Sequence, residues 1–263
     1  MTSRVTAFGQ RLKWWREQRS LSQLALAGMG DTSQRHLSFL ESGRAEPSRE
    51  MVLRLCAVLD VPLRQQNALL LAAGFAPVWR ESGLTDPELA QVDGALDFML
   101  AQQEPYPAFV VDRRWNLLRA NGGAGRFVAF LLGAVPDGPV NLADALVSPD
   151  VLRPLIVNWE DVAVHFLRSV QADAVADGTP ETADLLQRLM SYPAVPPLSH
   201  VASLETHTPV LSIHFRKGDT TLRVFTTIAT LGTPQDVTLQ EIRIECFFPA
   251  DEASAALLRH WAR

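Results

Sequence analysis

Hydrophobic positions between residues 1 and 76 recur at the spacing of amphipathic helices, which predicts an all-α domain of five short helices. The first helix runs from about Phe8 to Arg19 and turns Leu12 and Trp15 toward the core. A fourth helix follows Ser48, whose hydroxyl can cap the free amides at its start.

The stretch from Leu21 to Gly43 predicts two of these helices, joined by a tight turn at Gly30-Asp31. A serine precedes each helix at the N-cap position, Ser22 in the first case and Ser33 in the second. The side chains expected to face inward are Leu24, Ala27, Met29, Leu37 and Leu40.

The second helix of this pair opens with Gln34, Arg35 and His36, which a core helix rarely exposes together. Glutamine can pair with adenine and arginine with guanine, so this face is typical of a helix that reads the DNA major groove. The alternative is an amphipathic helical hairpin that binds no DNA. The order and spacing of the caps, the turn and the segment Glu41 to Ser48 favour DNA binding.

This stretch resembles the lambda-repressor-like helix-turn-helix regulators, also called the XRE family. The matching residues are Ser22-Gln23, Ala27, Ser33, Leu37, Leu40-Glu41, Gly43-Arg44 and Pro47-Ser48. The resemblance implies a pair between Arg16 and Glu41. The DNA-binding residues that we expect are Ser22, Gln23, Ser33, Gln34, Arg35, His36, Ser38 and Arg44. Two residues depart from the family pattern, Asp31 in place of glycine and Phe39 at a base-reading position.

Residues 77–105 are predicted to connect the two halves of the chain. Asp86-Pro87 opens a helix, and Pro105 and Pro107 then make a stiff entry to the next domain. The apolar face of this helix comprises Leu89, Val92, Leu96, Met99 and Leu100. We interpret the helix as a connector that could also take part in dimer contacts.

Residues 106–263 combine strand and helix periodicities. The predicted strands are 108–112, 115–120, 211–216, 222–228 and 237–246. The last of these strands is expected to contain a bulge at Gln240-Glu241. The predicted helices are 121–133, about 150–176 and 180–190. The pattern predicts an α+β domain with one five-stranded antiparallel sheet and helices over one face.

This half resembles the MmyB-like regulators, in which a helix-turn-helix precedes a PAS-like ligand-binding domain. The matching residues are 69–77, Glu104 to Ala108, Val111-Asp112, Trp115-Asn116, Ala120-Asn121 and Asn158 to Glu160. The resemblance implies an apolar pocket between the sheet and the helices, for which a long-chain fatty acid is a suitable occupant.

Nine apolar side chains are the candidates for lining such a pocket. They are Phe109, Val111, Trp115, Leu117, Trp159, Phe166, Leu211, Ile213 and Phe215. Apolar stripes more often fill a core than line a cavity, so the pattern alone leaves both interpretations open. For a ligand with a polar head, the candidates at the pocket mouth are Arg119, Asn121, His165 and Arg168.

The net charge of −5 is divided unevenly along the chain. Residues 1–75 contain ten Lys/Arg and six Asp/Glu, whereas the remainder contains fourteen and twenty-three. A surplus of four positive charges suits phosphate contacts but is modest, so we expect DNA binding to need two copies of the domain. The sequence predicts a cytoplasmic protein for three reasons. It has only two cysteines, in different predicted domains, no apolar run long enough for a membrane span, and no signal-peptide core.

Other chemistry finds less support in the sequence. Gly122 to Gly125 follows a strand, but Val128 stands where a dinucleotide-binding turn needs its third glycine. His200, His207 and His214 recur every seven residues without cysteines or carboxylates beside them. We therefore predict no enzymatic activity, no catalytic residue, no metal site and no cofactor apart from a bound fatty acid or similar apolar ligand.

The sequence thus predicts a DNA-binding transcription regulator whose C-terminal domain binds a small apolar ligand that modulates DNA binding. Its partners would be double-stranded DNA, the ligand and a second copy in a homodimer. The alternative is a DNA-binding scaffold or antitoxin-like protein whose C-terminal domain binds a protein partner. An internal cavity in that domain favours the first hypothesis, and a solid core favours the second.

Overall fold

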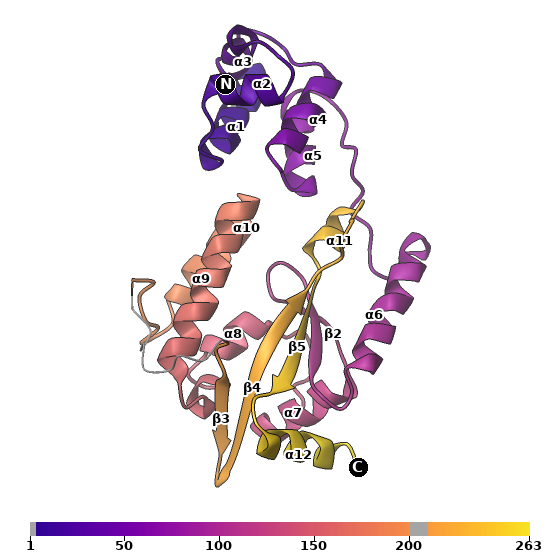
Figure 1. The fold of residues 1–263 in the computed structure, drawn as a ribbon, viewed down its shortest axis with the longest axis vertical. Helices are drawn as coiled ribbons and strands as arrows, with labels where there is room; N and C mark the ends of the chain where they lie inside the picture. The colour runs from indigo at the N-terminus through magenta and orange to yellow at the C-terminus, as the bar shows by residue number, and fades with distance from the viewer. Residues whose placement is uncertain (1–3, 200–209) are drawn as a thin grey trace. The chain divides into compact units, whose positions relative to one another are not determined.

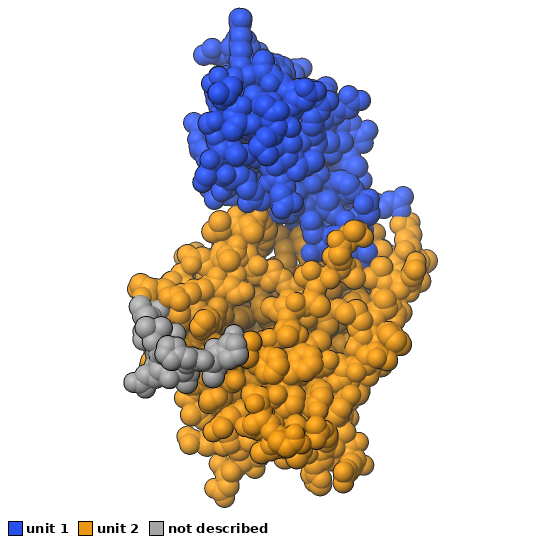
Figure 2. Space-filling view, viewed as in Figure 1, with its two compact units in different colours: residues 1–81, 234–240 blue, residues 82–233, 241–263 orange. Residues whose placement is uncertain are grey.

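The computed structural model describes residues 4–199 and 210–263, which form two compact units. Unit 1 contains residues 1–81 together with 234–240, and unit 2 contains residues 82–233 and 241–263 (Figure 2). Each unit has a hydrophobic core of its own. The helix that follows Asp86, predicted as part of a connector, belongs to unit 2.

Five helices of unit 1 surround one core, as the helical periodicity predicts. They are α1 (Arg4–Gln18), α2 (Gln23–Met29), α3 (Gln34–Glu41), α4 (Arg49–Val58) and α5 (Leu63–Ala72) (Figure 1). Leu12 and Trp15 of α1 are buried, as expected, and Phe8 is buried with them. Ser48 caps α4 by accepting a hydrogen bond from the Met51 amide.

The inward face of α2 differs from the prediction. Leu26 and Ala27 are buried, whereas Leu24 and Met29 are 66% and 58% exposed. A helix of seven residues makes only two turns, so its hydrophobicity alone does not select a face. The packing of α2 against α3 and α4 makes that selection.

A segment from the C-terminal part of the chain completes unit 1. It includes most of α11 (Val237–Glu241), where we had expected the start of a bulged strand. The prediction is wrong because Asp236 caps this segment as a helix, accepting from the Thr238 amide through Oδ1 at 2.9 Å. Val237 and Leu239 are buried, so their alternate spacing resembles that of a strand although the backbone is helical.

Two hydrogen bonds attach this segment to the rest of unit 1. The Val237 amide donates to the Arg80 carbonyl at 2.8 Å, and the Leu63 amide donates to Oε1 of Gln240 at 2.7 Å. Leu63 begins α5 directly after Pro62, which offers no side-chain cap. Gln240 therefore supplies an acceptor that a capping residue normally provides at a helix start.

Unit 2 contains the predicted five-stranded antiparallel sheet, with strand order β2-β1-β5-β4-β3 (Figure 1). The strands are β1 (Ala108–Val111), β2 (Leu117–Ala120), β3 (Ile213–Lys217), β4 (Thr220–Ala229) and β5 (Arg243–Pro249). Phe109 pairs with Glu245, and Glu245 pairs with Ile228, so these three side chains share one face of the sheet. The alternate residues Val110 and Ile244 face the other way and are also buried.

Helices lie on both sides of this sheet rather than on one, as Figure 1 shows for α9 and α6. The helices α7 (Gly122–Leu132), α8 (Leu142–Val147), α9 (Trp159–Asp177) and α10 (Pro180–Met190) share a core with the Phe109 face. The 3-10 turn Pro87–Leu89 leads into α6 (Ala90–Gln102), which contacts β1, and α12 (Glu252–Trp261) contacts β4 and β5. The sequence interpretation did not identify α8 or α12.

The long helix α9 begins at Trp159, later than the predicted start near residue 150. The intervening segment contains a 3-10 turn, Arg153–Leu155, and then bonds to the edge of β3. The Val157 amide donates to the His214 carbonyl at 2.8 Å, and Oδ1 of Asn158 accepts from the His214 amide at 3.0 Å. These long-range hydrogen bonds keep the segment out of the helix.

Candidate functional site

Serine caps define the two helices of the motif in unit 1. Ser22 Oγ accepts from the Ala25 amide at 3.0 Å, and Ser33 Oγ accepts from the His36 amide at 3.1 Å. Asp31 in the turn between them has φ of 50°, the left-handed conformation that asparagine and aspartate tolerate better than most residues. Both predicted caps are confirmed, and aspartate fills the glycine position of the family.

A buried ion pair holds α3 against α1. Arg16 Nε donates to Glu41 Oε1 at 2.6 Å, and Arg16 Nη2 donates to Glu41 Oε2 at 3.0 Å. The hydrogen bond to Glu41 raises the pKa of Arg16 against the opposing effect of burial. Nε2 of Gln23, at the start of α2, also donates to Glu41 Oε2 at 2.8 Å. One carboxylate therefore fixes three helices, and Gln23 belongs to this network in addition to its predicted DNA role.

Helix α1 crosses α3 closely at Gly9. A Cβ atom on Gly9 would lie 2.4 Å from the Leu40 carbonyl oxygen, which no real side chain tolerates. Gly43, with φ of 72°, follows the end of α3 in the left-handed conformation common at helix ends. Close packing at Gly9 and the buried ion pair together give α3 one fixed orientation in unit 1.

Phe39 supports two of the predicted DNA-binding arginines. The guanidinium carbon of Arg35 lies 5.4 Å from the Phe39 ring centroid, and that of Arg44 lies 6.0 Å from it. These distances are those of cation–π contacts. Sequence reasoning recognised Phe39 only as a departure from the family pattern, although the four-residue spacing from Arg35 places the two side chains on one helix face.

The eight predicted DNA-binding residues occupy the start of α2, the first turns of α3 and the segment after α3. Gln34, Arg35 and Arg44 are exposed, whereas His36 and Ser38 are half-buried. Side chains able to pair with bases thus face solvent from a rigid helix. Their individual DNA contacts remain predictions.

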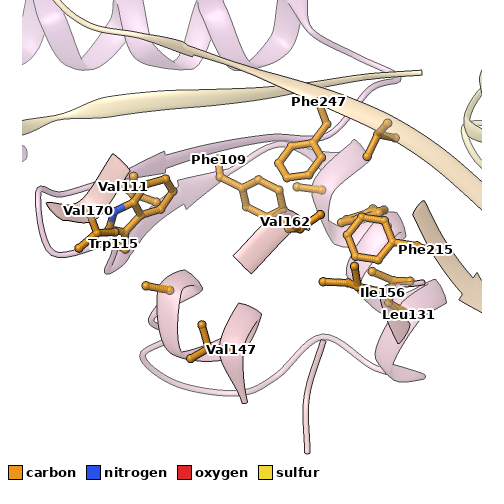
Figure 3. Packing of buried hydrophobic residues seen from close by; sticks show 14 of the residues in the cluster. Phe109, Val111, Trp115, Leu131, Val147, Ile156, Val162, Val170, Phe215 and Phe247 are labelled. Atoms are coloured by element: carbon orange, nitrogen blue, oxygen red, sulfur yellow. The ribbon is translucent and has the colours of Figure 1, made fainter. Parts of the chain in front are cut away.

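Unit 2 contains a cavity of about 370 Å³, within the size range of small-molecule sites. Its apolar lining comprises Phe109, Trp115, Phe127, Val128, Leu142, Leu146, Leu152, Val162, Phe166, Val210, Leu211, Ile213, Phe215, Ile228 and Phe247. Figure 3 shows Phe109, Phe247 and Val162 grouped together, with Trp115 and Phe215 to either side of them. Val210 and Ile228 are 47% and 46% exposed, which indicates that the cavity meets solvent beside them.

Six of the nine apolar candidates line this cavity, and three do not. The six are Phe109, Trp115, Phe166, Leu211, Ile213 and Phe215. Val111 is buried in the core and Leu117 packs against it. Trp159 does not line the cavity. The guanidinium carbon of Arg153 lies 5.1 Å from the centroid of the Trp159 ring, in a cation–π contact.

Among the described residues, the polar lining of the cavity comprises His165, Ser169, Thr226 and Glu245. Burial raises the pKa of Glu245 to about 7, against the opposing effect of a hydrogen bond with Thr226. Of these four residues, the sequence interpretation identified His165 alone. A signal for Glu245 existed, because a glutamate between Ile244 and Cys246 is unusual in a buried strand.

The other candidates for a polar ligand head have structural roles. Arg119 binds Asp93 and Asp97 of α6. Asn121 caps α7 through the Ala124 amide, and Arg168 donates to the Leu198 carbonyl. None of these three lines the cavity within the described residues.

The glycines at 122–125 form the first turn of α7 rather than a phosphate-binding loop. A Cβ atom on Gly123 would lie 2.6 Å from the Pro105 carbonyl oxygen, so this glycine permits a close backbone approach. His200 and His207 lie outside the described residues. Within residues 4–199 and 210–263, no cluster of His, Cys, Asp and Glu could hold a metal ion, and no helix could span a membrane.

Two family models match the chain. A helix-turn-helix model covers residues 12–66, and the MmyB-like transcription regulator ligand binding domain covers residues 92–260, more than half of the chain. The first match contains α2 and α3, and the second contains every described residue that lines the cavity. No curated protein matches the chain.

Among solved structures, the chain is similar to the restriction-modification controller protein C.AhdI from Aeromonas hydrophila. The identity is 31% over 24% of this chain and 94% of that one, with a TM-score of 0.23. It is also similar to an RNA-binding light-oxygen-voltage receptor, with 13% identity over 97% of this chain and 62% of that one, and a TM-score of 0.30. The capped helix-turn-helix, the α+β fold of unit 2 and the two family matches agree: the chain is a helix-turn-helix transcription regulator that belongs to the MmyB-like family.

Proposed function

We propose that a small apolar molecule binds in the cavity of unit 2 and changes how the helix-turn-helix of unit 1 binds DNA. The observation that supports this proposal most strongly is the cavity itself, because a concave, mostly apolar site of this size with a few polar groups is typical of small-molecule sites. A long-chain fatty acid suits the lining, since its apolar chain would contact aromatic and aliphatic side chains throughout.

The path of the chain supports a link between ligand and DNA. Thr226 and Ile228 of β4 and Glu245 and Phe247 of β5 line the cavity. The connection between these strands contains residues 234–240, which belong to unit 1. A ligand that shifts β4 relative to β5 therefore acts on the segment whose Gln240 binds the first amide of α5.

We further propose that the protein binds DNA as a homodimer. The surplus of four positive charges in residues 1–75 is small for a single DNA-binding domain. Two copies would place two α3 helices in successive major grooves, which suits a palindromic operator with half-sites one helical turn apart.

The test begins with native mass spectrometry of the purified full-length chain, which we expect to carry a small molecule. Operator DNA is then selected from a random pool, and its affinity is compared for stripped protein and for protein reloaded with decanoic acid. The expected change is roughly fivefold or more, typical of coupling between two sites. Sedimentation of the same samples reports whether dimers form.

Gln240→Ala tests the proposed link. We expect this variant to bind ligand normally while its DNA affinity no longer responds to the ligand, because Gln240 no longer accepts from the Leu63 amide. Gln187→Ala, at an exposed position of α10, is the matched control and should keep the full response. A wild-type protein that carries no ligand and ignores added ligand would contradict the proposal and favour a C-terminal domain that binds a protein partner.

A further inference from the structure

Of the described residues that line the cavity, Glu245 alone carries a carboxylate. It lies on the central strand β5, in register with Phe109 of β1 on one side and Ile228 of β4 on the other. Both neighbours line the cavity as well. The strand register therefore turns the Glu245 side chain into the cavity from the middle of the sheet.

The cost of burying a carboxylate at this position exceeds what its hydrogen bond with Thr226 returns to the fold. Burial disfavours the ionised form of a carboxyl group, and this burial raises the pKa of Glu245 to about 7. Valine, isoleucine or leucine would fill the same site of a β-sheet core without that cost. The residue is thus better explained by something that it binds than by packing.

Glu245 also has acceptor capacity that its protein partner does not use. Thr226 provides a side-chain hydrogen bond to Glu245, but a carboxylate has two oxygens and about four lone-pair sites. Hydrogen bonds to a charged group are stronger than those between neutral groups, most of all where water is scarce. The remaining oxygen sites face a cavity whose other described lining residues are apolar apart from His165, Ser169 and Thr226.

We propose that Glu245 recognises a hydrogen-bond donor on the ligand, so that the cavity selects an apolar molecule with a hydroxyl or amino group at this depth. This inference rests on the proposed ligand-binding function and names the ligand class. At pH 8, where the Glu245 carboxyl is largely ionised, a carboxylate or an ester placed against it would oppose acceptor to acceptor. A simple fatty acid can then bind only with its carboxylate turned away from Glu245, toward His165 of α9 or toward solvent.

The test uses four probes with the same apolar chain: 1-decanol, decylamine, decanoic acid and methyl decanoate. Their affinities for the stripped full-length protein are measured by calorimetry at one pH near 8. We expect 1-decanol or decylamine to bind roughly tenfold or more tightly than methyl decanoate, which has no donor. Tighter binding of decylamine than of 1-decanol would indicate an amine ligand. Tighter binding of 1-decanol would indicate an alcohol.

Glu245→Gln is the decisive variant, because it keeps the shape of the side chain and removes its charge. It should reduce the preference for the donor probes to roughly threefold or less and should strengthen binding of decanoic acid. Cys246→Ser, on the same strand but on the opposite face of the sheet, is the control and should keep the wild-type order.

The outcomes separate the two proposals. If no probe binds, the ligand-binding function itself is wrong. If all four probes bind with similar affinity, or if Glu245→Gln keeps the wild-type order, the cavity binds apolar molecules but Glu245 does not select them. Because the probe series compares ligands on wild-type protein, it remains decisive even if the variant fails to fold.

Discussion

The predicted DNA-reading surface and the cavity are built in opposite ways. The surface around α3 uses residues that are close in sequence, from Ser33 to Arg44, and its main contacts follow capping and i to i+4 spacing. The cavity uses strands and helices spread from Phe109 to Phe247. A site built from local rules has a shape before it meets its partner, whereas a site built from distant elements changes whenever one of those elements moves. This difference suits the roles proposed for the two sites, DNA binding for the surface and ligand binding for the cavity.

The largest expected effect is on stability, and it tests whether the two units unfold independently of each other. Glu41→Ala leaves the buried Arg16 guanidinium without its carboxylate, which should cost about 3–5 kcal/mol of stability. Hydrogen exchange measured on peptides of α1 and α3 should show the loss, while peptides of the β-sheet keep their protection. Glu46→Ala, at an exposed position, is the control. Equal loss in both units would mean that they unfold as one body.

The second prediction concerns the pH dependence that the cavity imposes. The pKa of Glu245 is raised from its ordinary value of 4.5 to about 7, so the folded state binds the proton more tightly than the unfolded state. Its stabilising contribution is therefore complete below pH 4.5 and is lost as the pH rises through 7.

Glu245→Gln removes this dependence. Relative to wild type, the variant should gain stability between pH 4.5 and pH 8, up to about 3 kcal/mol, because it has no charge to bury. Urea denaturation at several pH values measures the difference. Glu252→Gln, at an exposed position of α12, should show no such gain. A constant difference across the range would place the Glu245 carboxylate in water rather than in the cavity.

The third prediction addresses base reading by α3. Arg35→Ala should relax base preference at one operator position, with a loss of about 1–3 kcal/mol against the preferred base. Binding to a set of single-base operator variants measures this change. Lys13→Ala, on the exposed side of α1, should weaken binding equally across all variants if it contacts a phosphate. Unchanged affinity and preference for Arg35→Ala would refute the proposed docking of α3.

The smallest expected effect is on DNA affinity, and it concerns the Phe39 ring beside Arg35 and Arg44. Phe39→Leu keeps an apolar contact but removes the cation–π interaction, which should lower DNA affinity by about 0.5–1 kcal/mol. A double-mutant cycle with Arg35→Ala checks the mechanism. The affinity lost in the double variant should be smaller than the sum of the losses in the two single variants. Full additivity would mean that Phe39 acts independently of Arg35.

The sequence predicted the helix-turn-helix in detail because each of its signals is local. Ser22 and Ser33 are caps by residue type and position, and the pair between Arg16 and Glu41 came from the family resemblance. The error on α2 arose where local pattern was weakest, since a seven-residue helix can turn either face inward. Tertiary contacts buried Leu26 in place of Leu24.

After residue 81 the sequence predicted the order and type of most elements but not what ends or interrupts them. The start of α9 depends on hydrogen bonds from Val157 and Asn158 to His214, more than fifty residues away. Residues 237–241 are helical although Val237 and Leu239 alternate as in a strand. Cavity lining was predictable for residues in clear strands, and Glu245 was missed because a charged residue does not count toward an apolar stripe.

The discontinuity of unit 1 has a consequence for how the protein is made. A ribosome completes residues 1–81 long before it reaches 234–240, and at ordinary rates of translation the interval is on the order of ten seconds. During that interval the nascent helix-turn-helix lacks Gln240 at the start of α5 and the backbone bond from Val237 to Arg80. The β-sheet of unit 2 must therefore be largely synthesised before the DNA-binding unit can assume its final form.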